Sequence, residues 1–245
     1  MVGLADVVVW HDVECGGYEA DLQLWRSLAA DAAGPVLEIG CGTGRVALDL
    51  AERGFPVAAL DSEAALVRAL EERARARGLE VDATVGDARA LSLGRDFALV
   101  VAPMQVVQLM GGAQGRRAML ATVRAHLRGG GRFAAALADP FEGVPAEDAG
   151  PPLPDVREQD GWVFSSTPVA VRSEPGGTAI DRLRQAVSPE GRLDESMTSI
   201  VLDAVDPGEL EAEAEAGGFR VLPRRAVPPT GDYVGSAVVV LEVPR

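Results

Sequence analysis

The stretch VLEIGCGTGR, residues 36–45, joins four mostly apolar residues to three glycines at alternate positions, Gly40, Gly42 and Gly44. The apolar run predicts a short buried strand, and the residues from Arg45 onward predict a helix. Glycines between the two let the backbone turn sharply and leave no Cβ between the chain and a ligand. Amide groups at the start of the helix can then bind an anionic group. The stretch therefore predicts a strand, turn and helix that hold a ligand.

Strands and helices alternate on both sides of this turn. Strands are predicted at 57–60, 80–85, 97–102 and 131–137, and helices at 21–34, 45–53, 62–77 and about 115–127. The first of these helices has Asp21 at its start, where an aspartate can act as a cap. Strands that alternate with helices form βαβ units, so we expect an α/β fold with a mostly parallel sheet flanked by helices. Ligands of such sheets bind at the carboxyl ends of the strands.

The sequence changes character after Asp139. Residues 139–155 are rich in proline, glycine and acids, which predicts a loop. Three long strands are then predicted at 161–173, 178–187 and 193–204, because the stretches EPGG and PEGR between them are favourable turn sequences. We read these strands as an antiparallel insertion. A helix at 207–216 and strands near 218–225 and 236–243 are expected to complete the first sheet.

Composition limits the functions that the chain can have. Its 245 residues fit one domain, and its formal net charge of -14 argues against nucleic acid as a partner. No segment approaches the roughly 20 uninterrupted apolar residues of a membrane span. The N-terminus lacks the basic and apolar pattern of a secretory signal, so we expect a cytoplasmic protein. The two cysteines, Cys15 and Cys41, have no metal-site spacing and are expected to be free thiols.

The spacing of the glycines separates two kinds of ligand. A dinucleotide-binding turn follows the pattern GxGxxG, whereas this chain has GxGxG with Arg45 in the place of the last glycine. With the acid that ends VAALD and the GDA at 86–88, the turn resembles the class I S-adenosylmethionine-dependent methyltransferases. The resemblance covers about residues 18–140. It implies S-adenosylmethionine as cofactor and one methyltransferase domain over 1–245, with a Rossmann-like seven-stranded sheet and the insertion after the fifth strand.

The resemblance assigns cofactor contacts residue by residue. The glycine turn would hold the methionine part and Glu38 its amine, while Asp61 would take both ribose hydroxyls. Asp87 would lie near the adenine amino group, with a backbone amide of Ala88 against the ring. The Ala102 carbonyl and Pro103 would border the methionine, and Tyr18 matches an aromatic residue often found before the first strand. The implied cofactor set is Tyr18, Glu38, Gly40, Gly42, Gly44, Asp61, Ser62, Asp87, Ala88, Ala102 and Pro103.

Several of these residues also have a purely structural interpretation. The glycine turn could connect a strand to a helix without a ligand, and Asp87 could be a turn residue. Asp61 could cap the helix that starts at Ser62. A buried Glu38 is harder to explain structurally, because an unpaired buried carboxylate is costly.

The acceptor side is less well defined by the sequence. His11 has a pKa suited to a general base, although an ordinary surface or capping histidine explains it equally well. Trp10, Met104, Gln105, Trp162 and Tyr233 are candidates for acceptor binding. Aromatic residues in strands are, however, more often part of the core.

These patterns predict methyl transfer to a small molecule. The insertion at 161–204 resembles that of methyltransferases acting on glycine-like amines and amino sugars, which favours nitrogen over oxygen and makes the insertion a candidate lid over the acceptor. Two alternatives stay open. The protein could be a nicotinamide-dependent oxidoreductase, which Arg45 disfavours, or a non-catalytic module that binds the cofactor.

Overall fold

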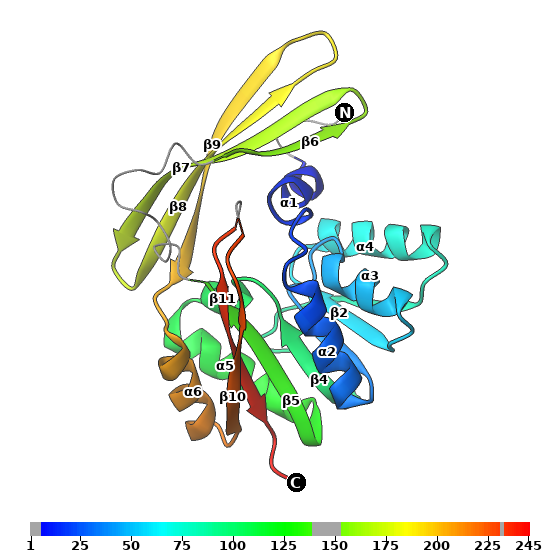
Figure 1. Ribbon diagram of the computed structural model, residues 1–245, viewed down its shortest axis with the longest axis vertical. Coiled ribbons are helices and arrows are strands. Elements are labelled where there is room, and N and C mark those ends of the chain that lie inside the picture. Colours follow the sequence, from blue (N-terminus) through cyan, green and yellow to red (C-terminus); the bar gives the residue numbers. More distant parts are fainter. Residues whose placement is uncertain (1–5, 139–152, 231–232) are drawn as a thin grey trace.

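A computed structural model describes residues 6–138, 153–230 and 233–245 of the chain. A seven-stranded sheet forms its centre (Figure 1). The strands lie in the order β10 (Arg220–Val227), β11 (Ser236–Glu242), β5 (Leu127–Leu137), β4 (Phe97–Ala102), β1 (Val36–Ile39), β2 (Val57–Asp61), β3 (Val81–Val85). All neighbours pair in parallel except β11, which is antiparallel to both β5 and β10. The predicted α/β fold with a mostly parallel sheet is confirmed.

Helices cover both faces of this sheet. On one face lie α2 (Leu22–Ala32), α3 (Arg45–Glu52) and α4 (Ala64–Ala76), whose apolar residues share a core with β1, β2 and β4. On the other face lie α5 (Gly112–Ala125), α6 (Pro207–Ala216) and the short 3₁₀ helix η1 (Val106–Leu109). Both faces of the sheet are therefore withdrawn from water.

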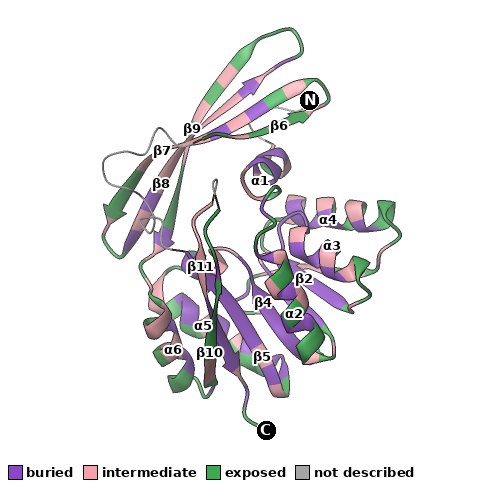
Figure 2. Ribbon diagram, viewed as in Figure 1, coloured by how far each residue is buried: buried purple, intermediate pink, exposed green. Residues whose placement is uncertain are grey.

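Burial of the strands follows from this layering. Every residue of β1 and β4 is buried, whereas the edge strands β3 and β10 are mostly half-buried or exposed (Figure 2). Parallel strands covered on both faces read as continuous apolar runs, which is why VLEI and FALVVA could be recognised in the sequence. Glu38 is the exception, because it is a carboxylic acid in the middle of a buried strand.

A separate antiparallel sheet follows β5 in the chain. It consists of β6 (Asp155–Gln159), β7 (Trp162–Glu174), β8 (Gly177–Val187) and β9 (Leu193–Asp203), in that order. The prediction of three strands missed β6, which pairs with β7 across Asp160 and Gly161. Both turn residues have positive φ, 52° and 78°, as a two-residue hairpin turn requires. The predicted loop at 139–155 lies outside the described residues except for its last three, and Asp155 already belongs to β6.

A short N-terminal helix, α1 (Val7–Cys15), lies between the two sheets (Figure 1). Its cap is Asp6, whose side chain accepts a hydrogen bond of 3.1 Å from the amide of Val8. Apolar side chains of α1 pack against Phe164 and Ala186 of the second sheet. Asp21 lies at the N-terminal cap position of α2, as predicted, but its side chain makes no capping hydrogen bond. Asp21 instead accepts a hydrogen bond of 2.8 Å from Nε1 of Trp25 and pairs with Arg45.

Candidate active site

A cavity of about 480 Å³ opens at the carboxyl ends of β1, β2 and β4. These strands are neighbours. From β1 the chain adds β2 and β3 on one side of it and then β4 on the other, so this is the switch point where α/β sheets bind ligands. Ten of the residues predicted from sequence line it: His11, Glu38, Gly40, Asp61, Ser62, Asp87, Ala88, Pro103, Met104 and Gln105. The structure thus gathers residues from distant parts of the sequence around one space.

The glycines of the turn make room for two close contacts. All have positive φ, 68° at Gly40, 54° at Gly42 and 98° at Gly44. A Cβ on Gly40 would lie 2.5 Å from Cγ2 of Val106, and one on Gly42 would lie 2.1 Å from Nε2 of His11. Only Gly40 lines the cavity, whereas Gly44 begins α3. The turn is therefore packed between η1 and α1, and its glycines allow that packing.

Asp61 fastens this turn to the end of β2. One carboxylate oxygen accepts a hydrogen bond of 2.8 Å from the amide of Gly42, and the other accepts one of 2.9 Å from the amide of Glu63. The cap of α4 is Glu63, which accepts a hydrogen bond from Ala65. Asp61 and the adjacent Ser62 still line the cavity. A carboxylate oxygen can accept more than one hydrogen bond, so Asp61 retains capacity for a ligand.

Glu38 is a buried carboxyl group with an atom that has no partner among the described residues. Its side chain is 2% exposed, and Oε2 makes no hydrogen bond. Burial raises the pKa of Glu38 to about 8, although the nearby Arg45 guanidinium opposes the shift. Such a group is costly in a folded protein unless a ligand completes it. Because Glu38 faces the cavity, an amine of a bound molecule could do so.

Asp87 already has a charged partner. Nε and Nη2 of Arg89 donate hydrogen bonds of 2.9 and 2.7 Å to its two carboxylate oxygens. These hydrogen bonds from Arg89 hold the pKa of Asp87 below its usual value. Asp87, Ala88 and Arg89 all line the cavity. Arg89 was not predicted from the sequence, although it follows the GDA motif directly.

The chain leaves β4 through residues that also border the cavity. Ala102 is completely buried and does not line the space, whereas Pro103, Met104 and Gln105 do. Met104 has a φ of 56°, a left-handed conformation that costs a residue with a side chain on the order of 1 kcal/mol. This backbone conformation belongs to the turn that brings η1 over the glycines.

One face of α1 forms another wall of the cavity. Val7, His11, Glu14 and Cys15 line it at helical spacing. Nδ1 of His11 lies 3.4 Å from the hydroxyl of Thr43, which donates its own proton to Asp12 at 2.7 Å. A neutral His11 that donates from Nδ1 keeps a free electron pair on Nε2. Burial lowers the pKa of His11, which favours this neutral ring.

Ion pairs hold α1 against both halves of the molecule. The buried Asp12 accepts hydrogen bonds of 2.9 and 2.5 Å from Arg73 of α4. Glu14 accepts hydrogen bonds of 2.7 and 2.8 Å from Arg184 of β8 and one of 2.8 Å from the hydroxyl of Ser166. The helix therefore connects α4 to the second sheet. No local sequence signal could have paired residues so far apart.

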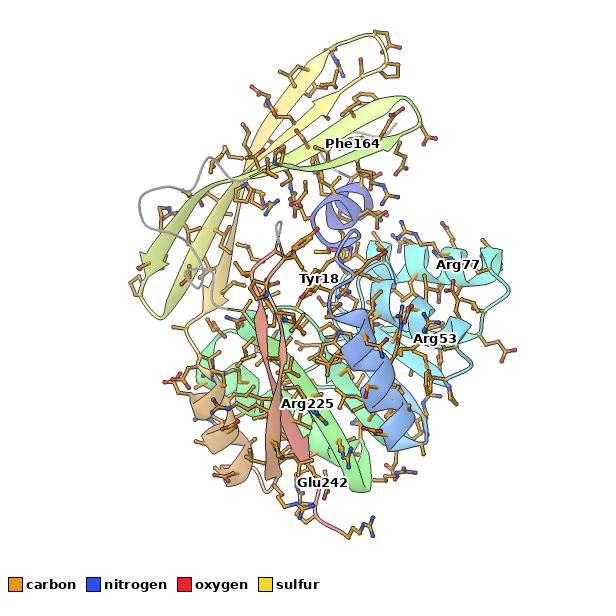
Figure 3. All side chains as sticks on the ribbon, viewed as in Figure 1. Tyr18, Arg53, Arg77, Phe164, Arg225 and Glu242 are labelled. Carbon is orange, nitrogen blue, oxygen red and sulfur yellow. The ribbon has the colours of Figure 1, made fainter. Side chains whose placement is uncertain are left out.

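Tyr18 lies outside the cavity, in the core beside the glycine turn. Its ring packs against Tyr233 with centroids 4.8 Å apart, and the guanidinium of Arg45 lies 5.1 Å from its centroid. Figure 3 shows Tyr18 where the chain between α1 and α2 meets the β10–β11 end of the sheet. Arg45 also donates two hydrogen bonds of 2.5 and 2.8 Å to the carboxylate of Asp21. The residue that breaks the dinucleotide pattern thus holds the N-terminal segment in place.

Two of the candidate acceptor residues lie in the small core under the second sheet. The ring of Trp10 meets Phe164 edge to face at 5.5 Å, and Trp162 stacks on Phe164 at 6.1 Å. Neither tryptophan lines the cavity, and the same is true of Tyr233, which packs on Tyr18. Arg184 and Ile200 of the second sheet do line it, together with Leu109 and Met110. Sequence analysis missed these four residues.

Comparison with known proteins shows which family model part of the chain matches. Residues 36–131 match the family model described as a methyltransferase domain. The cypemycin N-terminal methyltransferase of a Streptomyces species is 33% identical over 107 residues, and the match takes in 44% of this chain and 43% of that protein. The chain therefore aligns with less than half the length of this curated relative.

Solved structures resemble nearly the whole chain. The sugar N-methyltransferase KedS8 from Streptoalloteichus has a TM-score of 0.76 at 17% identity, covering 100% of this chain and 96% of that one. CalS10, an amino pentose methyltransferase from Micromonospora echinaspora, has a TM-score of 0.73 at 20% identity, covering 99% of each chain. None of the described helices is long and apolar enough to cross a membrane. Residues 36–131 therefore resemble a methyltransferase domain, and the chain shares its fold with solved S-adenosylmethionine-dependent methyltransferases.

Proposed function

We propose that this protein transfers a methyl group from S-adenosylmethionine to an amine of a small molecule. The observation that carries the proposal is the buried Glu38 carboxyl, whose Oε2 has no partner among the described residues and which lies beside the GxGxG turn. The amino group of the cofactor's methionine part would supply the missing partner. The methyltransferase family match over 36–131 supports this assignment.

Other lining residues fit the remaining parts of the cofactor. Asp61 at the end of β2 would take the ribose hydroxyls with the lone pairs that Gly42 and Glu63 leave free. Asp87 would receive the adenine amino group beside its pairing with Arg89, and Ala88 would offer a backbone amide. Gly40 and Pro103 would border the methionine part. Tyr18, Gly42, Gly44 and Ala102 lie behind this wall, so their contribution would be to its shape.

The chemistry needs little from the protein beyond position and a dry site. S-adenosylmethionine, when bound, would supply an electrophilic methyl carbon. The lone pair of a neutral acceptor amine would form the C–N bond as the C–S bond breaks with its electron pair left on sulfur, and the nitrogen would then lose a proton. His11 would accept this proton, because it lines the cavity and burial favours its neutral form. Met104 and Gln105 would face the acceptor.

The second sheet would form the acceptor side. Arg184 of β8 and Ile200 of β9 line the same cavity as Glu38 and Asp61, which supports the interpretation of 161–204 as a lid over the acceptor. Nitrogen is favoured over oxygen because KedS8 and CalS10 are described as methyltransferases of a sugar nitrogen and of an amino pentose. The cypemycin enzyme is likewise described as an N-terminal methyltransferase.

Calorimetry with S-adenosylhomocysteine and with NAD tests the cofactor first. We expect micromolar binding of S-adenosylhomocysteine and none of NAD, and the reverse result would instead favour a nicotinamide-dependent oxidoreductase. A screen of amines, phenols and carboxylates then tests transfer, with release of S-adenosylhomocysteine as readout. Product with amines supports the proposal. Cofactor binding without product across all three classes would make the protein a non-catalytic binding module.

A further inference from the structure

We propose that the acceptor carries an apolar body, which is seated by Val7, Leu109 and Ile200 at the opening of the cavity. This inference rests on the proposed function, since it concerns the acceptor of the same site. The three side chains line the cavity and are also 39%, 45% and 41% exposed. Residues that line the cavity and are also exposed lie where the cavity meets solvent. We call this set the apolar collar.

The collar is assembled from three separate elements. Val7 comes from the start of α1, Leu109 from the end of η1 and Ile200 from β9. Hydrogen bonds fix these elements to one another. Asp203 at the end of β9 accepts one of 2.6 Å from the amide of Gly112, just after η1, and Glu14 of α1 pairs with Arg184 of β8. The collar therefore has a defined shape before a ligand arrives.

The alternation of side chains along β9 separates the collar from the outer surface of the second sheet. Ile200 pairs in register with Ile180 of β8 on the face toward the cavity, and the buried Leu202 follows on the same face. Met197 and Val201 point to the opposite face, because successive side chains of a strand alternate. Ile200 is thus directed at the cavity by the strand geometry.

The charged side chains beside the collar are already paired. Glu14 is held by Arg184, and Asp87 is held by Arg89. Anchoring a phosphate or carboxylate of the acceptor here would require one of these arginines to leave a bidentate partner. Burial of apolar surface needs no such exchange. The collar therefore favours an aliphatic or aromatic amine over an acceptor whose body is polyhydroxylated or anionic.

Two amines of equal size test the inference by binding rather than by turnover. Hexylamine and 2-(2-aminoethoxy)ethanol have the same number of non-hydrogen atoms, but one methylene of the first is an ether oxygen in the second and its terminal methyl is a hydroxyl. Calorimetry would measure each against the complex of the protein with S-adenosylhomocysteine. We expect hexylamine to bind about tenfold more tightly, since burying a methylene contributes about 0.8 kcal/mol and 1.4 kcal/mol is a factor of ten.

Variants locate the effect in the collar. Ile200→Ser and Leu109→Ser are each expected to weaken hexylamine binding about three- to tenfold and to leave 2-(2-aminoethoxy)ethanol unchanged. Met197→Ser is the matched control, because Met197 is 61% exposed on the opposite face of the same strand. Equal affinity for the two amines, or equal effects of Ile200→Ser and Met197→Ser, would overturn the inference. Failure to bind S-adenosylhomocysteine at all would instead contradict the proposed function.

Discussion

The imidazole of His11 covers the backbone of Gly42 so closely that a Cβ on the glycine would lie 2.1 Å from Nε2. This contact joins the N-terminal helix to the glycine turn across 30 residues of sequence. It also explains why a side chain is disfavoured at Gly42, although this residue does not line the cavity. The space that the side chain would need is occupied by His11 of α1.

Gly42→Ala is expected to lower the free energy of unfolding by about 3 kcal/mol, because the new methyl group meets a packed ring and the residue keeps a positive φ. In a His11→Ala background the clash is absent, so the same substitution should cost about 1 kcal/mol. Urea unfolding of the four proteins gives the coupling between the two sites. Gly78→Ala serves as control, since Gly78 has a φ of 65° with no atom near its virtual Cβ. Equal costs in both backgrounds would contradict the packing explanation.

Glu38 predicts an unusual pH dependence of stability. Burial raises its pKa from 4.5 to about 8, so between these values the folded protein holds a proton that the unfolded chain has released. The free energy of unfolding should therefore fall as pH rises, by about 1.4 kcal/mol per pH unit from this group. Comparing the wild type with Glu38→Gln at pH 5.5 and 7.5 isolates the effect, because the variant cannot titrate there. The difference in the free energy of unfolding between the two proteins should change by about 2–3 kcal/mol between these pH values. The same difference at both pH values would exclude the raised pKa.

Asp61 is expected to matter for both the turn and the cofactor. Asp61→Ala should weaken binding of S-adenosylhomocysteine by about 1–3 kcal/mol, through the loss of charged hydrogen bonds to the ligand. It should also lower stability, because the amides of Gly42 and Glu63 lose their acceptor. Calorimetry measures the first effect and urea unfolding the second. Asp82→Ala, which removes an exposed partner of Arg95, is the control for a lost surface charge. Reduced stability with unchanged affinity for S-adenosylhomocysteine would mean that Asp61 holds the glycine turn and does not bind the cofactor.

His11 as a general base predicts a specific pH profile. Burial lowers its pKa, so the ring stays neutral to lower pH than an ordinary histidine. Turnover should then show an acid limb from His11, beyond the pH dependence of the acceptor amine itself, that lies below the usual range of histidine, as the ring becomes protonated. His11→Gln should reduce turnover about 10²-fold or more and abolish that limb, with little change in the affinity for S-adenosylhomocysteine. A variant with normal turnover and weakened cofactor binding would make His11 a positioning residue of the glycine turn.

The ion pair of Asp12 with Arg73 is expected to contribute to stability. Burial would raise the pKa of Asp12, but hydrogen bonds from Arg73 and Thr43 outweigh it and hold the pKa below its usual value. The contribution is therefore present above the unfolded pKa and is lost as pH falls through the folded one. Asp12→Asn should cost about 2 kcal/mol at pH 7, less than for a fully buried pair because Arg73 is 31% exposed. Glu52→Gln, which breaks an exposed pair with Arg77, should cost under about 0.5 kcal/mol. Similar costs for both variants, measured by urea unfolding, would contradict a special role of Asp12.

The hairpin of β6 and β7 has a local signal in the sequence at its turn. Asp160 and Gly161 form the dipeptide that a two-residue turn prefers, and the structure gives both a positive φ. A loop is predicted at 139–155 and the next strand only from residue 161, although β6 covers Asp155–Gln159. Its strand character depends on pairing with β7, whose register sets Asp155 opposite Ser166.

The sequence by itself determined the strands and most of the helices of the first sheet, the glycine turn and the acids that follow the strands. These features are local: buried parallel strands need continuous apolar residues, and a turn with positive φ needs glycine. Only the tertiary structure decided which side chains share the cavity. Trp10 and His11 are neighbours in the sequence, yet the helix turns one into the core with Phe164 and the other toward the glycine turn. Arg184 and Ile200 reach the cavity because a sheet inserted far along the chain packs on α1. Such contacts depend on packing between distant segments, which no local pattern of residues records.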